Sequence, residues 1–189
     1  MIRKTLSILG IWLLTATAIL AQSRDEMKLK EGSLIHFREQ GTAIVSIDLS
    51  EAKFGKENVY EEYRNTEEVV LPKKTLDRAI SDLCTQFNYQ NKGGIQLQDK
   101  EADVLYRLEI LVSKLNEGSS GGVLNIDDKT SGGAKISGMV KLTDALTGKT
   151  LCLIEFYDIS SDSKISKKAR LTGAFEELGF QLGKLVKQK

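Results

Sequence analysis

The chain has 189 residues, of which 41% are hydrophobic, and this is ordinary for a globular protein with its own core. Its 27 basic and 26 acidic side chains leave a formal charge close to zero. Nucleic-acid-binding proteins concentrate Lys and Arg on one face or in one run. The densest basic cluster here lies between 164 and 170, among serines at the start of a helical pattern, and we interpret it as solvated surface. Nucleic acid is therefore not a predicted partner.

Residues 1–21 have the three parts of a secretory signal peptide. Arg3 and Lys4 form a basic start, an apolar run follows, and small residues then lead to a cleavage site after Ala21 or, alternatively, after Ala18. The apolar run is shorter than the about 20 residues of a bilayer span. Cleavage removes two basic residues and leaves a formal charge of −1. We expect a periplasmic or secreted protein without a stable membrane span after cleavage.

Residues 22–33 are charged and without hydrophobic periodicity, which predicts a flexible lead-in to a single domain over 34–189. The apolar stretch 34–37 fits a turn of helix or a strand end. Apolar residues occupy alternate positions from 43 to 49, as in a strand with one buried face. Residues 58–65 are polar apart from two tyrosines, and we interpret them as a weak helix or an ordered loop.

Two amphipathic helices are predicted. The first spans 75–87, where apolar residues recur at steps of three and four, and the only proline, Pro72, lies just before it. The second begins near Lys167 and shows the same recurrence. Three glycines interrupt it, namely Gly173, Gly179 and Gly183. Each lowers helix stability by about 1 kcal/mol relative to alanine, and we interpret them as places where this helix approaches the sheet closely.

Three further strands are predicted at 104–112, 135–143 and 150–159. The turn 144–149 joins the last two, and Gly148 suits the left-handed position of a tight hairpin. On each predicted strand, apolar residues alternate with polar ones, so that one face of the strand is apolar and the other polar. This pattern favours a mainly antiparallel sheet of about four strands that is solvated on one face. Both helices would pack on the other face. The predicted fold class is α+β, as a two-layer sandwich.

Cys84 and Cys152 lie in apolar patterns on different predicted elements. In an oxidising compartment they either form a disulfide or remain small buried side chains, which is the usual state of free cysteine. Gln22 follows Ala21, so the cysteine to which bacterial lipoproteins attach their lipid is missing from this site.

Two short motifs resemble ligand-binding loops. The tripeptide 148–150 reads Gly-Lys-Thr, like the end of a phosphate-binding loop, but that motif needs glycine at position 143, which is Thr. It also lies between two strands, and we interpret it as a hairpin turn. Asp127 and Asp128 lack the spaced oxygen ligands of a calcium loop. We predict no cofactor and no metal ligand.

Nucleophilic catalysis is not indicated either. His36 is the only histidine, and no serine or cysteine has a nucleophile motif around it. A zinc site from His36 and the two cysteines would lack close ligand pairs. Glycoside hydrolysis needs only two well-placed acids. Candidates on the predicted strands are Glu109, Glu155 and Asp158.

Glycine is dense between the strands that end near 112 and begin near 135. Such a segment is either an exposed hairpin loop of low order or a place where the backbone approaches a ligand or partner. As a possible interaction loop we single out its glycines, Gly118, Gly121, Gly122, Gly132 and Gly133.

Several of these segments occur together in a known kind of protein. The stretch 102–110 resembles the pattern A-D-x-x-L-x-x-x-I, with Tyr106 in the place of its Leu, a glycine-rich loop follows, and 144–151 fits D-x-x-T-G-K-x-L before a closing helix. With the strand at 45–50, this order resembles small envelope domains of Gram-negative bacteria, notably Bacteroidetes, over residues 33–187. A more distant similarity is to the periplasmic domains of the curli-secretion and penicillin-binding-protein-activator lipoproteins. That resemblance implies a non-catalytic role through protein contacts.

The sequence therefore favours an exported, non-catalytic envelope protein that binds a protein or a cell-wall component. The open sheet face and the 118–133 loop are the expected contact surfaces. One alternative is an exported glycan or peptidoglycan hydrolase, whose paired carboxylates would lie about 5–10 Å apart. Another is a small-ligand carrier, which needs an apolar cavity between sheet and helices.

Overall fold

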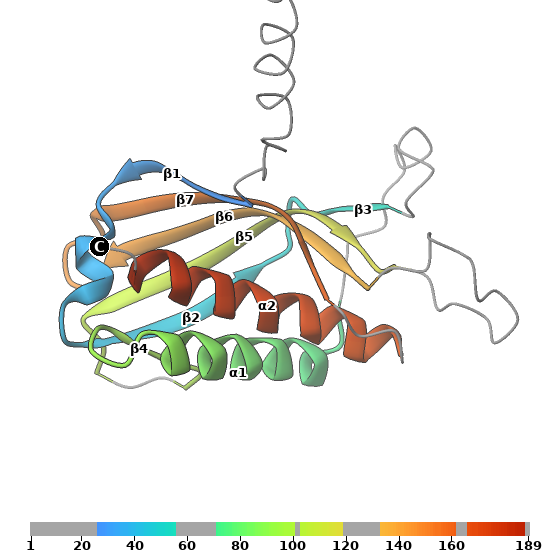
Figure 1. Cartoon of the computed structure of the whole chain (residues 1–189), viewed down its shortest axis with the longest axis horizontal. Coiled ribbons are helices and arrows are strands. Elements are labelled where there is room, and N and C mark those ends of the chain that lie inside the picture. Colours follow the sequence, from blue (N-terminus) through green and yellow to red (C-terminus); the bar gives the residue numbers. More distant parts are fainter. Residues whose placement is uncertain (1–25, 56–70, 101–102, 119–132, 162–165, 188–189) are drawn as a thin grey trace, which may run out of the picture.

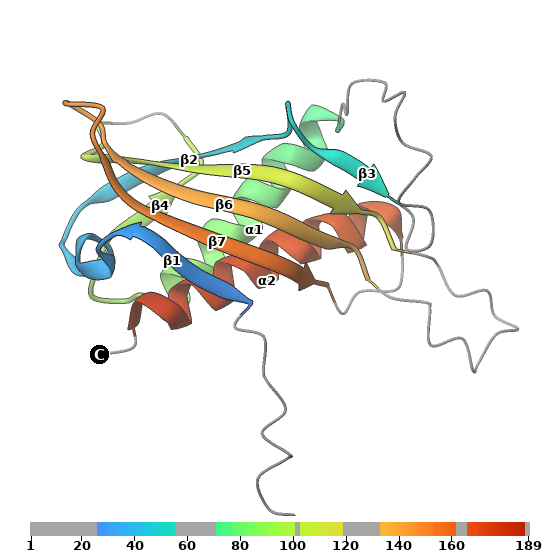
Figure 2. The same ribbon diagram turned by 90° about the horizontal axis from the view of Figure 1, so that it is seen from above.

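Within the described residues, seven strands form one open mixed sheet, and two long helices lie side by side on one of its faces (Figure 1, Figure 2). The computed structural model describes residues 26–55, 71–100, 103–118, 133–161 and 166–187. The strands are β1 (Met27–Gly32), β2 (Thr42–Asp48), β3 (Lys53–Gly55), β4 (Gln96–Gln98), β5 (Tyr106–Asn116), β6 (Lys135–Asp144) and β7 (Thr150–Ser160). The helices are the 3-10 helix η1 (Leu34–Arg38), α1 (Lys73–Gln90) and α2 (Lys167–Lys187).

The order of strands across the sheet is β1-β7-β6-β5-β2-β4, and β3 pairs with β5 beyond the end of β2. β5, β6 and β7 form an antiparallel meander, to which β1 adds an antiparallel edge. β2 and β3 instead run parallel to β5, and β4 runs parallel to β2. Parallel neighbours need a crossover connection. The chain makes this crossover through α1, between β2 and β5.

The α+β class, both amphipathic helices and the β6–β7 hairpin are confirmed. Gly148 has a φ of +70°, as a left-handed turn position requires. The helix alternative for 34–37 is also confirmed, as η1. The predicted strand number was too low, and three of the six pairings among the described strands are parallel. The weak helix or loop expected at 58–65 lies outside the described residues.

β1 corrects the expectation that 22–33 is a flexible lead-in. Met27 to Gly32 pair with β7, and the N–H of Tyr157 donates to the carbonyl of Glu26 at 2.8 Å. Five of the six β1 residues are exposed, so the strand has no apolar alternation to reveal it. Lys28 and Lys30 on this edge are typical of the charges that protect sheet edges from further pairing.

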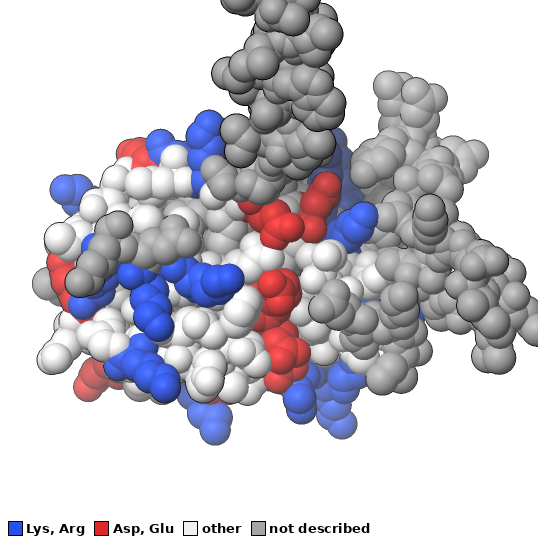
Figure 3. Space-filling model, in the orientation of Figure 1, with Lys and Arg blue, Asp and Glu red and all other residues white. Residues whose placement is uncertain are grey.

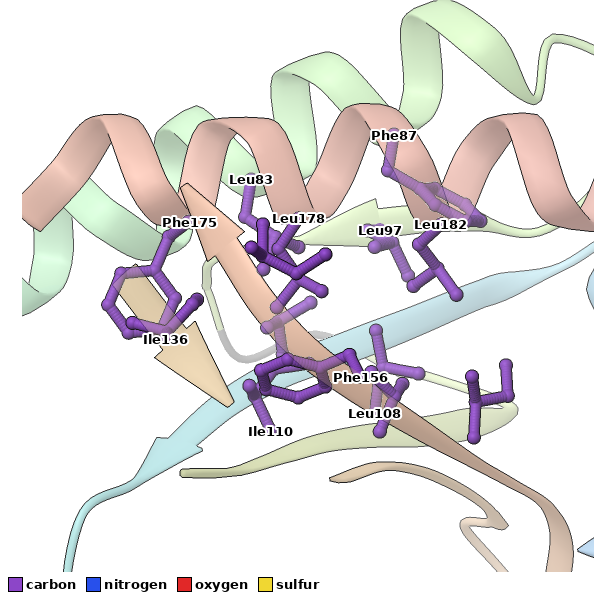
Figure 4. Close-up of a cluster of buried hydrophobic side chains, with 14 of the residues drawn as sticks. Leu83, Phe87, Leu97, Leu108, Ile110, Ile136, Phe156, Phe175, Leu178 and Leu182 are labelled. Atoms are coloured by element: carbon purple, nitrogen blue, oxygen red, sulfur yellow. The ribbon is translucent and has the colours of Figure 1, made fainter. Parts of the chain in front are cut away.

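The hydrophobic core lies between the sheet and the two helices. Figure 4 shows Leu83 and Leu178 on the helices above Ile110 and Phe156 on the sheet. All four side chains are fully buried. Burial of side chains of this size contributes about 1.5–3 kcal/mol each to folding. The small-ligand carrier would need an apolar cavity in this space, which is lined by these buried side chains.

Two glycines of α2 lie against α1 rather than against the sheet. A Cβ atom on Gly179 would lie 2.3 Å from the carbonyl oxygen of Leu83. A Cβ on Gly183 would lie 2.5 Å from the Cβ of Gln90. The close approach that the sequence predicted is therefore present at these two positions, but its partner is the other helix. This contact fixes α1 and α2 as one layer.

Candidate functional site

The face of the sheet opposite the helices is built from alternate residues of the central strands. On β5, Leu108 and Ile110 point into the core, and Glu109 between them is half-buried on the other side. β6 and β7 alternate in the same way. The open-face residues of these three strands include Arg107, Glu109, Leu111, Met139, Lys141, Leu153 and Glu155.

An apolar strip crosses this open face. Leu111 on β5 lies directly opposite Met139 on β6. On β7, Leu153 comes two residues before Glu155, which is the direct partner of Met139. Leu111, Met139 and Leu153, which we call the apolar strip, are all half-buried. The strip gives an otherwise polar face an apolar centre.

Two cross-strand ion pairs flank the apolar strip. Lys141 Nζ lies 3.3 Å from a carboxylate oxygen of Glu109, and Lys30 Nζ lies 3.0 Å from one of Glu155. Hydrogen bonds from Tyr157 and then Lys30 lower the pKa of the Glu155 carboxyl. Glu155 is therefore held as a charged partner of Lys30. Exposed pairs of this kind contribute little to stability, but they fix the positions of charges around the strip.

The three predicted carboxylates do not form an acid pair. Glu109 pairs with Lys141, and Lys141 pairs with Leu153, so Glu155 lies two strands across and two residues further along the sheet. Their backbones are therefore separated by roughly 10 Å across the strands and by about 7 Å along them. A general acid needs a raised pKa at neutral pH, whereas that of Glu155 is lowered. The Asp158 carboxylate instead accepts a hydrogen bond from the Ser137 hydroxyl at 3.4 Å. This arrangement does not support the hydrolase alternative.

Two of the five candidate loop glycines lie in the described residues. Gly118 has a φ of +67°, and its N–H donates to Asn116 Oδ1 at 2.9 Å. A Cβ on Gly133 would lie 1.6 Å from the carbonyl oxygen of Ser161. Both glycines therefore have a structural reason for their positions, and their role in binding stays a prediction. The other three lie outside the described residues: Gly121, Gly122 and Gly132.

His36 belongs to a small polar cluster on η1. Its Nδ1 lies 3.3 Å from one carboxylate oxygen of Glu39, and the Tyr106 hydroxyl donates to the other at 2.7 Å. The Tyr106 bond is the main cause of the lowered pKa of Glu39. Among the described residues, no three His, Cys, Asp or Glu side chains are grouped to hold a metal ion. The cluster links η1 to the start of β5.

The described part of the helix layer carries charged side chains with local partners, beside the exposed ring of Tyr89 on α1. Figure 3 shows acidic side chains across the middle of this side, with basic side chains to left and right. On α2, Glu176 accepts from Gln86 Nε2 at 2.9 Å, and Glu177 accepts from Gln181 Nε2 at 3.0 Å. Such mixed charges with local partners are typical of a solvated surface. The open sheet face is therefore the better candidate for contacts.

The two cysteines are free and buried, one on α1 and the other on β7. This agrees with the interpretation of both as core side chains rather than as a disulfide. Burial raises the pKa of the Cys84 thiol to about 12 and that of Cys152 to about 11. Because the thiolate is the reactive form, both groups should be inert in the folded protein.

This inertness can be measured with a thiol reagent. At about pH 8, below the ordinary cysteine pKa, we expect neither Cys84 nor Cys152 to be modified in the folded protein. Both should react rapidly once the chain is unfolded in denaturant, and mass spectrometry would count the modified sites. Fast reaction without denaturant at either cysteine would contradict the buried placement.

Comparison with known proteins gives remote structural neighbours. No protein-family model matches the sequence, and no curated protein matches it. Among solved structures, the chain is similar to the PelC dodecamer from Paraburkholderia phytofirmans, with 12% identity, a TM-score of 0.39, and coverage of 82% of this chain and 95% of that chain. It is also similar to protein XCC0632 from Xanthomonas campestris, of the DUF330 family, with 12% identity, a TM-score of 0.39, and coverage of 80% and 86%.

Likeness at this level carries no conclusion about function. The resemblance to Bacteroidetes envelope domains and to the curli-secretion and penicillin-binding-protein-activator lipoproteins stays a prediction from the sequence. Over the described residues, neither long helix is apolar over enough of its length to cross a membrane.

Proposed function

We propose that this protein is an exported, non-catalytic module that binds an envelope protein or a cell-wall component through the open face of its sheet. The signal-like pattern of residues 1–21 supports export, to the periplasm or beyond it. The loop between β5 and β6 is a second proposed contact region, with Gly118 and Gly133 at its ends.

The observation that carries the proposal is the apolar strip with its charged rim. Protein interfaces typically have an apolar centre and a polar border, and Leu111, Met139 and Leu153 lie between the two lysine–glutamate pairs in that manner. The strip lies on strands whose other faces are fully packed, so its position is rigid. A rigid surface loses less conformational entropy when it binds a partner.

A photo-reactive amino acid at Met139, introduced into the protein in its native envelope, tests this proposal. We expect a covalent adduct of defined mass, because Met139 lies at the centre of the strip. In the same chain, Leu153→Asp should reduce the adduct about tenfold or more, since it places a charge in an apolar contact.

The matched control places the same photo-reactive group at Arg78, an exposed residue on α1. This position lies on the helical side and should give no adduct of that mass. No adduct at position 139, or equal adducts at both positions, would contradict binding through the open face.

A further inference from the structure

One row of side chains crosses the open face of the sheet at right angles to the strands. Asp48 on β2 pairs with Leu111 on β5, which pairs with Met139 on β6. Met139 pairs in turn with Glu155 on β7, and Glu155 pairs with Lys28 on β1. Because the side chains of directly paired residues share one face of a sheet, all five belong to the open face. Met139 is the middle member of the row.

The two ends of this row carry opposite charges and lie equally far from its middle. Asp48 and Lys28 are each two strands away from β6, which is about 10 Å at the usual strand spacing. The Ser50 N–H donates to Asp48 Oδ1 at 2.8 Å and lowers the pKa of this carboxyl, so Asp48 is negative at neutral pH. Lys28 is exposed at the opposite edge of the sheet. The row is therefore acidic at one end, basic at the other and apolar in the centre.

A surface with this arrangement is complementary to itself. Rotation about a two-fold axis parallel to β6 exchanges the two ends of the row, so Asp48 of each copy would face Lys28 of the other. Met139 would meet its own counterpart at the axis. Leu111 would lie over β7 of the other copy, which carries Leu153 of the apolar strip. The interfaces of two-fold dimers require self-complementarity of this kind.

We propose that the protein forms a two-fold dimer in which the open faces of two copies pack on each other, with Met139 at the axis and Asp48 paired with Lys28 across the interface. This rests on the proposed function, which makes the open face the binding surface, and it names a second copy of the chain as the partner. Two sheets that pack face to face lie about 10 Å apart, with their strands at about 30° to each other. The long, flexible side chain of Lys28 can bridge the offset that this angle produces at the edges.

The size of the open face, which is turned towards the viewer in Figure 2, suits such a dimer. The strands β5, β6 and β7 have 11, 10 and 11 residues, and β1 and β2 on either side have 6 and 7. At about 4.8 Å per strand and about 3.3 Å per residue, these five strands cover roughly 700 Å². Each partner in a protein interface of standard size contributes about 800 Å². The face is therefore large enough for a specific contact between two copies.

The ion pairs of the face limit the affinity of this dimer. Lys141 keeps Glu109 as its partner, and Lys30 keeps Glu155, so neither pair brings an uncompensated charge into the interface. Taking such pairs out of water nevertheless costs free energy, and their mutual attraction offsets only part of it. We therefore expect a reversible dimer that dissociates on dilution.

Charge reversal tests the pairing across the axis. In sedimentation equilibrium at micromolar concentrations, the mass of the exported protein should rise with concentration towards that of two chains. Asp48→Lys and Lys28→Asp should each raise the dissociation constant about tenfold or more, because each places like charges opposite one another at both ends of the row. Both changes in one chain should recover most of the loss, since the two charges then only exchange places.

Asp77→Lys is the matched control, because Asp77 is an exposed acid on α1, on the side of the molecule away from the open face. It should leave the dissociation constant unchanged. A protein that stays monomeric at all these concentrations would overturn the dimer, and so would a double variant that associates no better than the single ones.

The photo-crosslink at Met139 separates a failure of this dimer from a failure of the proposed function. An adduct with the mass of two chains would support the dimer. An adduct of another mass, from a protein that is monomeric in sedimentation, would overturn the dimer but leave binding through the open face intact. Absence of any adduct at position 139 would contradict both.

Discussion

Replacing Gly179 with alanine should lower the free energy of unfolding by about 2–3 kcal/mol, as overpacking does. The added Cβ atom would lie 2.3 Å from the carbonyl oxygen of Leu83 on α1. Because that atom belongs to a helix backbone, it cannot move aside as the end of a side chain could. The two helices would have to separate over their closest contact. Urea unfolding followed by circular dichroism would measure the change.

Whether Gly179→Ala lowers or raises the free energy of unfolding distinguishes a packing effect from an effect of helix propensity. Propensity alone predicts that glycine to alanine in a helix stabilises by about 1 kcal/mol. Gly93→Ala is the control, because a Cβ there would meet nothing within 4 Å. It should change stability by no more than about 0.5 kcal/mol. A Gly179→Ala variant as stable as the parent would show that α1 and α2 do not touch at this point.

The helices illustrate which parts of a fold a sequence can reveal. Their apolar stripes repeat over many residues, so both α1 and α2 were predicted at close to their observed positions. The partner of the glycines in α2 could not be predicted in the same way. A glycine signals close approach, but nothing within one helix tells whether a sheet or another helix approaches it.

The sheet was harder to predict because several strands carry too little pattern. β3 and β4 have three residues each, which is shorter than two periods of alternation. β1 buries only Met27, so its pairing with β7 depends on backbone hydrogen bonds rather than on apolar side chains. β2 and β5 alternate as antiparallel strands do, yet they pair in parallel. The crossover connection through α1 makes these two strands parallel. The alternation of apolar and polar residues along a strand does not reveal such a connection.

The same limit applies to the candidate site. From the sequence, we predicted that Glu109 and Glu155 lie on strands and that the open face of the sheet is a contact surface. Their partners Lys141 and Lys30 depend on strand order and register, which a single sequence does not supply. β1 itself was missed, so the Lys30 pair could not be expected. The apolar strip could have been suspected from Leu111 and Leu153, which break the polar side of their alternation.

Replacing Phe37 with alanine should destabilise the protein by about 3–5 kcal/mol, the usual range for a buried phenylalanine. The side chain is completely buried, and its ring lies 6.0 Å from that of Phe87 on α1. The Phe37 carbonyl also accepts from Asn91 Nδ2 at 2.8 Å and from the Ile95 N–H at 3.1 Å. Loss of the ring would weaken the position of η1 and, through these bonds, the turn that leads into β4.

Ile35→Ala in the same five-residue helix is the matched control, because Ile35 is 56% exposed. It should lower the free energy of unfolding by about 0.5 kcal/mol or less, although both residues belong to one short apolar stretch. Chemical denaturation of both variants at equal protein concentration would give the difference. Similar losses for the two would mean that η1 is not anchored by Phe37, and the link from η1 to the ends of α1 and β4 would then be wrong.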